Sequence, residues 1–269
     1  LFNISGLRLP LVLTCAARAI SAPINIWNDH QDVVSLRDSG WFQFHAEDIQ
    51  EAMDLHLMGY RLAEDKSIML PVMISMDGFI LTHGIETVDM PTEEQINAFL
   101  PAYKPLYKLD PANPITMGPL VDPDYYMETR YAIAKTMEES LELIPKIAQD
   151  FAKLTGRAYN GLIEKYYTDD AQRVVVAMGS ACGTIKEVID EFRKKGKKVG
   201  LLKVTSFRPF PAKAIYEALK GVEKVAVIDR ALSLGSYAPL EAEVKACFCG
   251  KKKAPEAIAS FVLGLGGRD

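Results

Sequence analysis

The carboxyl-terminal part of the sequence alternates between short apolar runs and segments with helical periodicity, and this alternation limits the possible folds most strongly. From Arg173 onward, apolar runs that predict strands lie at residues 174–178, 199–204, 225–228 and 258–263. Helices are expected between them, at residues 184–195, 211–220 and 238–246. Strands separated by helices of this length predict an α/β fold with a mostly parallel sheet.

The amino-terminal part is less regular but carries the same two kinds of segment. Apolar runs at residues 9–15 and 68–75 predict buried strands, and the second run is continuous enough for a parallel strand covered on both faces. Apolar residues at helical spacing predict helices over residues 46–64 and 125–154. Pro145 is expected to kink or restart the second helix.

A proline-rich segment separates these helices. Thr92 is a plausible cap for a short helix that opens just before it. Six prolines between residues 101 and 123 then predict an extended, stiff segment. Apolar side chains interleaved with the prolines predict that the segment packs against another surface: Tyr103, Tyr107, Leu109, Ile115 and Met117. Residues 156–170 are interpreted as the connection to a second domain.

Arg18 is the first candidate for binding chemistry. It follows the first predicted strand and lies among the small residues of the run CAARAISA. In α/β folds, ligand sites lie at the carboxyl ends of strands, and a guanidinium there can bind a carboxylate or phosphate through two hydrogen bonds. The residues that follow include Asn25, Trp27, Asn28, Asp29, His30, Gln31 and Asp32. The alternative is a structural arginine paired with Asp29 or Asp32.

Composition and motif spacing exclude several other classes. A net charge of −4 does not favour nucleic-acid binding, and the apolar runs are too short for a membrane span, so a soluble, cytoplasmic protein is expected. The four cysteines form no CxxC pair, so an iron–sulfur cluster is not expected on this chain. The segment 179–183 lacks GxGxxG spacing and is interpreted as a tight turn. Arg208 is interpreted as a subunit or domain contact.

An ordered set of motifs resembles a known family over nearly the whole chain. The segments are RAISAPINIWNDHQD, RDSGW, AEDIQEA, DGFILTH, NPITMG, MGSACGTIKEVID, KVTSFRPFP and GLGGRD. They closely resemble the alpha subunit of pyruvate:ferredoxin oxidoreductases, thiamine-diphosphate enzymes that oxidise 2-oxoacids to acyl-CoA. The resemblance implies a pyrimidine-binding-type domain at residues 1–158 and a transketolase carboxyl-terminal-like domain at residues 159–269. It also suggests that the sequence is truncated at both ends and that the first domain lacks its amino-terminal part.

The resemblance implies roles for particular residues. Arg18 would be the catalytic and substrate-binding arginine that holds the carboxylate of the 2-oxoacid. Ile26 would give apolar contact near the substrate methyl group, and Asp29 and His30 are candidates to line the pocket and tune protonation. No residue of this chain is assigned to the cofactor or to a metal.

The resemblance also implies cofactors and partners. Thiamine diphosphate and Mg²⁺ would bind at a site completed by a beta chain and by an upstream segment containing a Glu, and coenzyme A would be a co-substrate. The 4Fe–4S clusters would lie only on partner chains, among which gamma and delta subunits are ferredoxin-like, and ferredoxin would accept the electrons.

Two alternatives remain open at this point. One is the same chemistry on a branched 2-oxoacid such as 2-oxoisovalerate. Related sequences of that type tend to carry a bulky aromatic residue where His30 lies, so His30 favours pyruvate. The other is a non-catalytic scaffold subunit, which would have no need for Arg18 and its polar loop.

Overall fold

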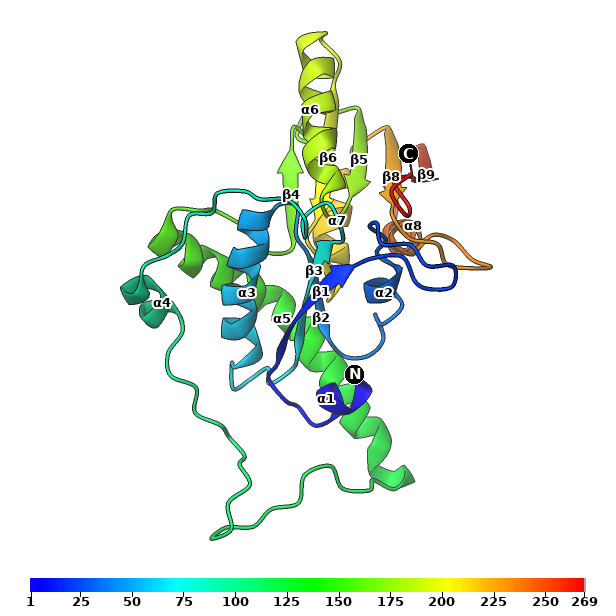
Figure 1. Cartoon of the computed structure of the whole chain (residues 1–269). Coiled ribbons are helices and arrows are strands. Elements are labelled where there is room, and N and C mark those ends of the chain that lie inside the picture. Colours follow the sequence, from blue (N-terminus) through cyan, green and yellow to red (C-terminus); the bar gives the residue numbers. More distant parts are fainter. Residues whose placement is uncertain (269) are drawn as a thin grey trace.

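Two β-sheets with flanking helices organise the chain, and the computed structural model describes residues 1–268 (Figure 1). The first sheet has the order β1-β3-β2-β7 and the second the order β4-β6-β5-β8-β9. No helix in residues 1–268 combines the length and apolar character that a membrane crossing needs. The predicted α/β class is confirmed.

The first sheet is parallel except at one edge. Its strands are β1 (Val12–Ala17), β3 (Val72–Asp77), β2 (Phe42–His45) and β7 (Ser206–Arg208). β1 and β2 pair with β3 in parallel, whereas β7 pairs with β2 in the antiparallel direction. β2 and β7 were not predicted from the sequence, and β1 and β3 lie a few residues later than predicted.

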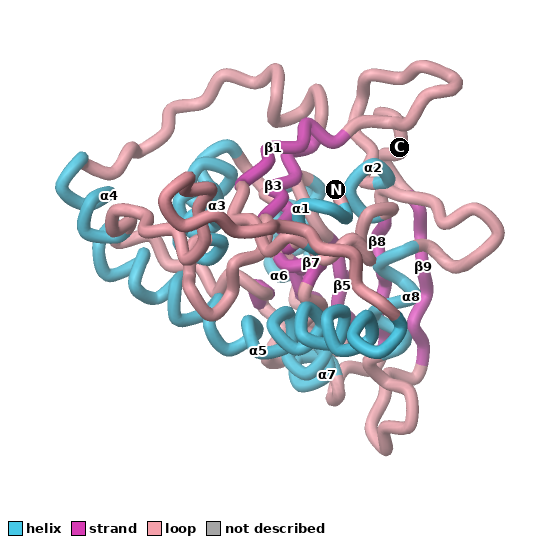
Figure 2. Tube along the Cα trace, turned by 90° about the horizontal axis from the view of Figure 1, so that it is seen from below, coloured by secondary structure: helices cyan, strands magenta, loops and turns pink. Residues whose placement is uncertain are grey.

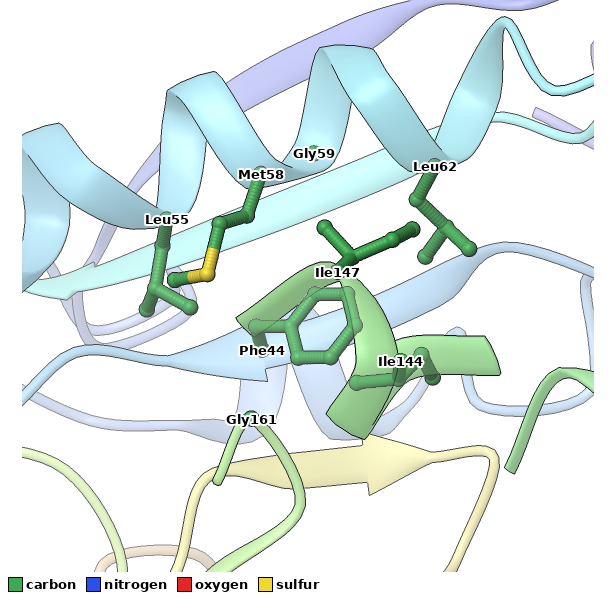
Figure 3. Close-up of a pocket in the computed structure, with 8 residues that line it drawn as sticks. All are labelled: Phe44, Leu55, Met58, Gly59, Leu62, Ile144, Ile147 and Gly161. Carbon is green, nitrogen blue, oxygen red and sulfur yellow. The ribbon is translucent and has the colours of Figure 1, made fainter. Parts of the chain in front are cut away.

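Helix α3 (Ile49–Ala63) begins at Asp48, whose side chain accepts a hydrogen bond from the Glu51 backbone N–H. Its apolar side packs on β3, and Gly59 allows the close approach because a Cβ there would lie 3.2 Å from Val72 Cγ1. Apolar side chains from α3, β2 and α5 point toward one another around a small cavity (Figure 3). This cavity has an entirely apolar lining and belongs to the core.

Helix α5 (Pro123–Thr155) begins after the capping residue Asp122 and ends at Gly156, which has a left-handed φ of 77°. The helix continues through Pro145, so it does not restart there, and the alternative expectation of a kink stays a prediction. α4 (Glu93–Phe99) begins at Thr92 with a capping box, which confirms the predicted cap. Two short helices were not predicted, α1 (Phe2–Gly6) and α2 (Gln31–Val34).

The proline-rich segment joins α4 to α5 as a long loop without regular structure (Figures 1 and 2). Its apolar side chains do not pack on the rest of this chain as a set. Tyr107 is 70% exposed, Leu109 77% and Leu120 101%. Within residues 1–268 these side chains stay exposed, so the packing of the segment against another surface stays a prediction.

The second sheet follows the predicted βα alternation. β5 (Arg173–Ala177), β6 (Val199–Val204), β8 (Lys224–Asp229) and β9 (Ala257–Val262) are parallel. The helices are α6 (Ala181–Lys194), α7 (Ala212–Leu219) and α8 (Pro239–Ala246). One correction concerns residues 156–170, because they contain the antiparallel edge strand β4 (Ile163–Tyr166) and are more than a connection.

The two parts of the chain are joined by β7 and by a buried ion cluster. The Arg208 side chain pairs with Glu243 of α8 inside the second part of the chain, whereas its backbone in β7 pairs with Gln43 of β2 in the first part. Lys203 Nζ lies 2.7 Å from Glu47 Oε2 and 2.9 Å from Glu51 Oε1. Burial alone lowers the pKa of Lys203, but the surrounding carboxylates outweigh it and raise that pKa above its usual value.

Candidate functional site

The candidate site lies where β1 and β3 end side by side. The Gly78 backbone N–H donates to the Ala17 carbonyl at 2.7 Å. A Cβ on Gly78 would lie only 2.6 Å from that carbonyl oxygen, so this contact requires glycine. The contact brings the loop after β3 against Arg18, the first residue after β1.

Arg18 presents a charged side chain that the rest of the chain does not use. Its backbone N–H donates to Asp32 Oδ2 at 3.1 Å, but within residues 1–268 its guanidinium makes no hydrogen bond or ion pair. Asp29 instead accepts from the Gln31 backbone N–H at 2.7 Å. The alternative of a structural ion pair with Asp29 or Asp32 is therefore not supported. Arg18 is exposed and free to bind an anion.

Apolar and aromatic side chains from the same two loops form an exposed rim. Trp27 is 42% exposed and Ile26 47%. The Trp27 ring lies 5.0 Å from the Phe79 ring, which in turn stacks on His83 at 4.8 Å. Phe79 has a φ of 68°, a conformation that is rare for a bulky residue and common at functional sites. A guanidinium beside such a rim suits a ligand with a carboxylate and a small apolar group.

His30 and Asp29 lie inside the protein, beneath this rim. His30 is 1% exposed, and its Nε2 lies 2.7 Å from Asp77 Oδ1. Its ring also packs on His45, whose pKa is lowered to about 3 by burial. Burial raises the pKa of Asp29. Of the four predicted site residues, Arg18 and Ile26 thus reach the surface, whereas Asp29 and His30 support the loop from within.

Asp77 is the centre of a buried polar network that the sequence analysis did not find. Its Oδ2 accepts from Arg230 Nη1 at 2.6 Å and from Ser180 Oγ at 2.6 Å. Burial alone raises the pKa of Asp77, but His30, Arg230 and the Ser180 hydrogen bond together hold it below its usual value. Asp77 ends β3 and Arg230 follows β8, positions that could have marked these two residues.

The turn after β5 and the carboxyl-terminal glycines contribute to the same site. Gly179 has a φ of 67°, which confirms the tight turn, and a Cβ there would lie 2.9 Å from both Asp77 oxygens. The Gly266 N–H donates to the Asn28 carbonyl at 2.9 Å. Asn25 Nδ2 donates to the Gly266 carbonyl at 3.0 Å. The second part of the chain therefore packs directly on the loop that carries Trp27.

The donor set does not suit a divalent metal. In residues 1–268 no group of three or more His, Cys, Asp or Glu side chains is arranged to hold a metal ion. Asp77 at the end of β3 and Asp32 in α2 already accept hydrogen bonds from protein groups. The residues present fit a substrate carboxylate and an apolar ring, but they do not fit a metal-bridged diphosphate.

Similarity to solved structures defines the class of fold. The chain matches 2-oxoglutarate:ferredoxin oxidoreductase from Magnetococcus marinus, solved with 2-oxoglutarate, coenzyme A and succinyl-CoA, with a TM-score of 0.63 at 13% identity over 100% of this chain and 48% of that chain. It matches a split-gene transketolase, an inactive beta4 tetramer, with a TM-score of 0.50 at 10% identity over 94% of this chain and 56% of that one. The fold is that of the transketolase-like α/β proteins.

Sequence similarity then identifies the family. Residues 1–149 match the model of the thiamine-diphosphate-binding domain of pyruvate flavodoxin/ferredoxin oxidoreductases, and residues 171–269 match core domain II of pyruvate:ferredoxin oxidoreductase. Pyruvate synthase subunit PorA of Methanothermobacter thermautotrophicus is 47% identical over 98% of this chain and 68% of its own length. Ketoisovalerate oxidoreductase subunit VorA of Pyrococcus horikoshii is 42% identical over 98% of this chain and 67% of its own length. The chain belongs to the pyruvate:ferredoxin oxidoreductase family.

Proposed function

We propose that this chain is the alpha subunit of a pyruvate synthase, in which Arg18 holds the carboxylate of pyruvate. The complex oxidatively decarboxylates pyruvate to acetyl-CoA and passes electrons to ferredoxin. The observation that carries the proposal is the Arg18 guanidinium, exposed at the end of a parallel strand and without an ionic partner in residues 1–268. Such a group binds a planar carboxylate through two parallel hydrogen bonds.

The surrounding side chains set the rest of the pocket. Ile26 and Trp27 give the apolar surface on which the methyl group of the substrate rests, and they exclude water from the keto carbon. Because His30 is buried and its Nε2 is bonded to Asp77, its role is to hold the loop in the shape that suits a small substrate. Asp29 acts in the same way through its hydrogen bond to the Gln31 N–H.

Thiamine diphosphate supplies the decarboxylation chemistry in this class of enzyme. The described residues provide no ligand set for Mg²⁺ and the diphosphate. We therefore assign that half of the cofactor site to a beta chain, together with an upstream segment of the alpha subunit. The same reasoning assigns the 4Fe–4S clusters to the gamma and delta subunits, because the cysteines lack ligand spacing. Coenzyme A is the co-substrate.

A branched 2-oxoacid is the second candidate substrate. The observation in its favour is the identity to the ketoisovalerate oxidoreductase subunit, 42% against 47% for the pyruvate synthase subunit. The residue at position 30 favours pyruvate. His30 is bonded to Asp77 inside the protein, so the loop keeps the shape that suits a small substrate.

The test compares arginine variants of the assembled complex, assayed with pyruvate, coenzyme A and ferredoxin. Loss of the carboxylate contact in Arg18→Ala should lower kcat/KM for pyruvate by about 10- to 150-fold. Arg173 is a matched control, because it is exposed and its side chain has no recorded partner in residues 1–268. Arg173→Ala should stay within about twofold of the parent enzyme. Unchanged kinetics in Arg18→Ala would refute the proposed role.

A further inference from the structure

We infer that Arg230, from the second part of the chain, is a positioning residue. It holds residues 18–32, here called the substrate loop, and thereby the Arg18 side chain. This inference rests on the proposed function. Arg230 follows β8, far from Arg18 in the sequence, and its side chain is 14% exposed. It makes its contacts with the first part of the chain through both its side chain and its backbone.

The guanidinium of Arg230 joins three separate segments. Nη1 donates to Asp77 Oδ2 at 2.6 Å and to Ser180 Oγ at 2.7 Å. With the Asn28 amide oxygen turned toward it, that oxygen accepts from Nε at 3.1 Å and also lies 2.9 Å from Nη1. One planar group thus fixes the end of β3, the turn before α6 and the substrate loop together.

The backbone of Arg230 holds the loop at a second point. Its carbonyl accepts from the His30 N–H at 2.8 Å, so the loop is bound at residues 28 and 30 by one residue. Gly264 lies against the same guanidinium, because a Cβ there would be 3.0 Å from Arg230 Nε. Gly266 adds a further contact, because its N–H donates to the Asn28 carbonyl.

The position of Asn28 is passed to Arg18 through the backbone. Arg18 and Asn28 form an antiparallel β-bridge, and the Ala19 N–H donates to the Trp27 carbonyl at 3.1 Å. The loop between them has no helix or strand of its own and is rich in small residues. Its conformation therefore depends on these external contacts. A displacement of Asn28 moves the residue that binds the carboxylate.

Arg230 itself is not a catalytic residue, because its guanidinium is bonded to Asp77 and Ser180. The guanidinium is buried against Asp77 and does not form part of the exposed rim. Small errors in the placement of a substrate-binding group can cost about 100-fold in rate. The contacts of Arg230 therefore keep Arg18 in place for the substrate, in addition to joining the two sheets.

The test uses Arg230→Gln in the assembled enzyme with Lys186→Gln as the matched control. Lys186 also crosses from the second part to the first, since its Nζ lies 2.8 Å from Glu47 Oε2. It belongs to the Lys203 cluster and not to the substrate loop. Arg230→Gln should raise KM for pyruvate by about 10- to 100-fold and leave KM for coenzyme A unchanged. Lys186→Gln should change neither KM, and Arg230→Lys, which keeps the charge, should recover part of the loss.

Amide hydrogen exchange gives a readout that does not depend on activity. Peptides covering residues 18–32 should exchange faster in Arg230→Gln than in the parent, while those of β5 and β6 stay the same. If Arg230→Gln lowers only kcat and stability, with KM for pyruvate and loop exchange unchanged, Arg230 is merely structural and the inference fails. If the parent complex does not oxidise pyruvate, the proposed function fails, and the exchange experiment still decides whether Arg230 holds the loop.

Discussion

Asp77 and Asp229 occupy equivalent places in the two sheets and have opposite electrostatic properties. Each is the last residue of a parallel strand, β3 or β8, and each is 1% exposed. Asp77 faces the Arg230 guanidinium and the His30 ring, and its pKa lies below the usual value although burial alone raises it. Within residues 1–268 Asp229 accepts only from the Leu240 and Glu241 backbone N–H groups, and burial raises its pKa to about 6.

The difference shows that a position at a strand end does not by itself determine the pKa of a buried carboxyl group. A buried carboxyl group at a strand end is costly as an anion unless a cation lies beside it. In the first sheet that cation is Arg230, from the second part of the chain. The same ion pair therefore stabilises the Asp77 anion and joins the two parts of the chain. In the second sheet the carboxyl group accepts hydrogen bonds from backbone N–H groups at the start of α8.

The largest effect is expected when the charge of Asp77 is removed. Asp77→Asn leaves the buried Arg230 guanidinium without its anion and should lower the free energy of unfolding at pH 7 by about 3–5 kcal/mol. The folded-state pKa of Asp77 is depressed, so its stabilisation is present above about pH 4 and is lost as pH falls below that value. Urea unfolding of both proteins at pH 7 and pH 3 measures this. A difference below about 1 kcal/mol at pH 7 would contradict the pairing.

The equivalent change in the second sheet should have the opposite sign. Asp229→Asn keeps an oxygen acceptor for α8 but removes the buried charge, and should stabilise the protein by about 1–3 kcal/mol at pH 7. Because the folded-state pKa is raised, the parent becomes more stable as pH falls from about 6 to about 4, and the advantage of the variant shrinks. Urea unfolding at pH 7 and pH 4.5 is the measurement. Destabilisation at both pH values would show that Asp229 is needed as an anion.

The strands of the second sheet were predicted better from the sequence than those of the first sheet. Strand β6 was predicted with its observed bounds, because the parallel strands of the second sheet alternate with helices, whereas the edge strand β4 of the same sheet was missed. β2 was missed because Phe42–His45 is fully buried yet alternates aromatic with polar residues, so no apolar run marks it. β7 has three residues and forms only by pairing with a distant strand.

The candidate site divides in the same way. Arg18 could be found because a local pattern, a strand followed by small residues, surrounds it. Arg230 could not, because its role arises from contacts with Asn28 and Asp77, which no local pattern relates to it. The burial of His30 also needed the structure, since its residue type fits a pocket lining equally well.

A smaller effect is expected from the residue that Asp77 holds. His30→Trp replaces a ring bonded to Asp77 with a larger one, which should reshape the loop beneath Ile26. The ratio of kcat/KM for pyruvate to that for 2-oxoisovalerate should change by more than about twofold, or about 0.4 kcal/mol. Steady-state assays of the assembled complex with both substrates measure the ratio. A ratio that stays within those limits would mean that position 30 does not influence substrate size.

The smallest expected effect concerns the cofactor: this chain alone should bind thiamine diphosphate with Mg²⁺ weakly or not at all. The carboxyl groups at the two strand ends are committed, Asp77 to Arg230 and Asp229 to the start of α8. Tight Mg²⁺-diphosphate binding needs free oxygen ligands, so the remaining contact would be apolar and offset by the loss of ligand freedom. Calorimetric titration of the chain should give no isotherm at micromolar concentrations, whereas addition of a beta chain and the upstream segment should restore binding. A one-to-one micromolar isotherm without them would require one of the two carboxyl groups to exchange its protein partners for the metal, and the contrast between Asp77 and Asp229 would then no longer describe the cofactor-bound state.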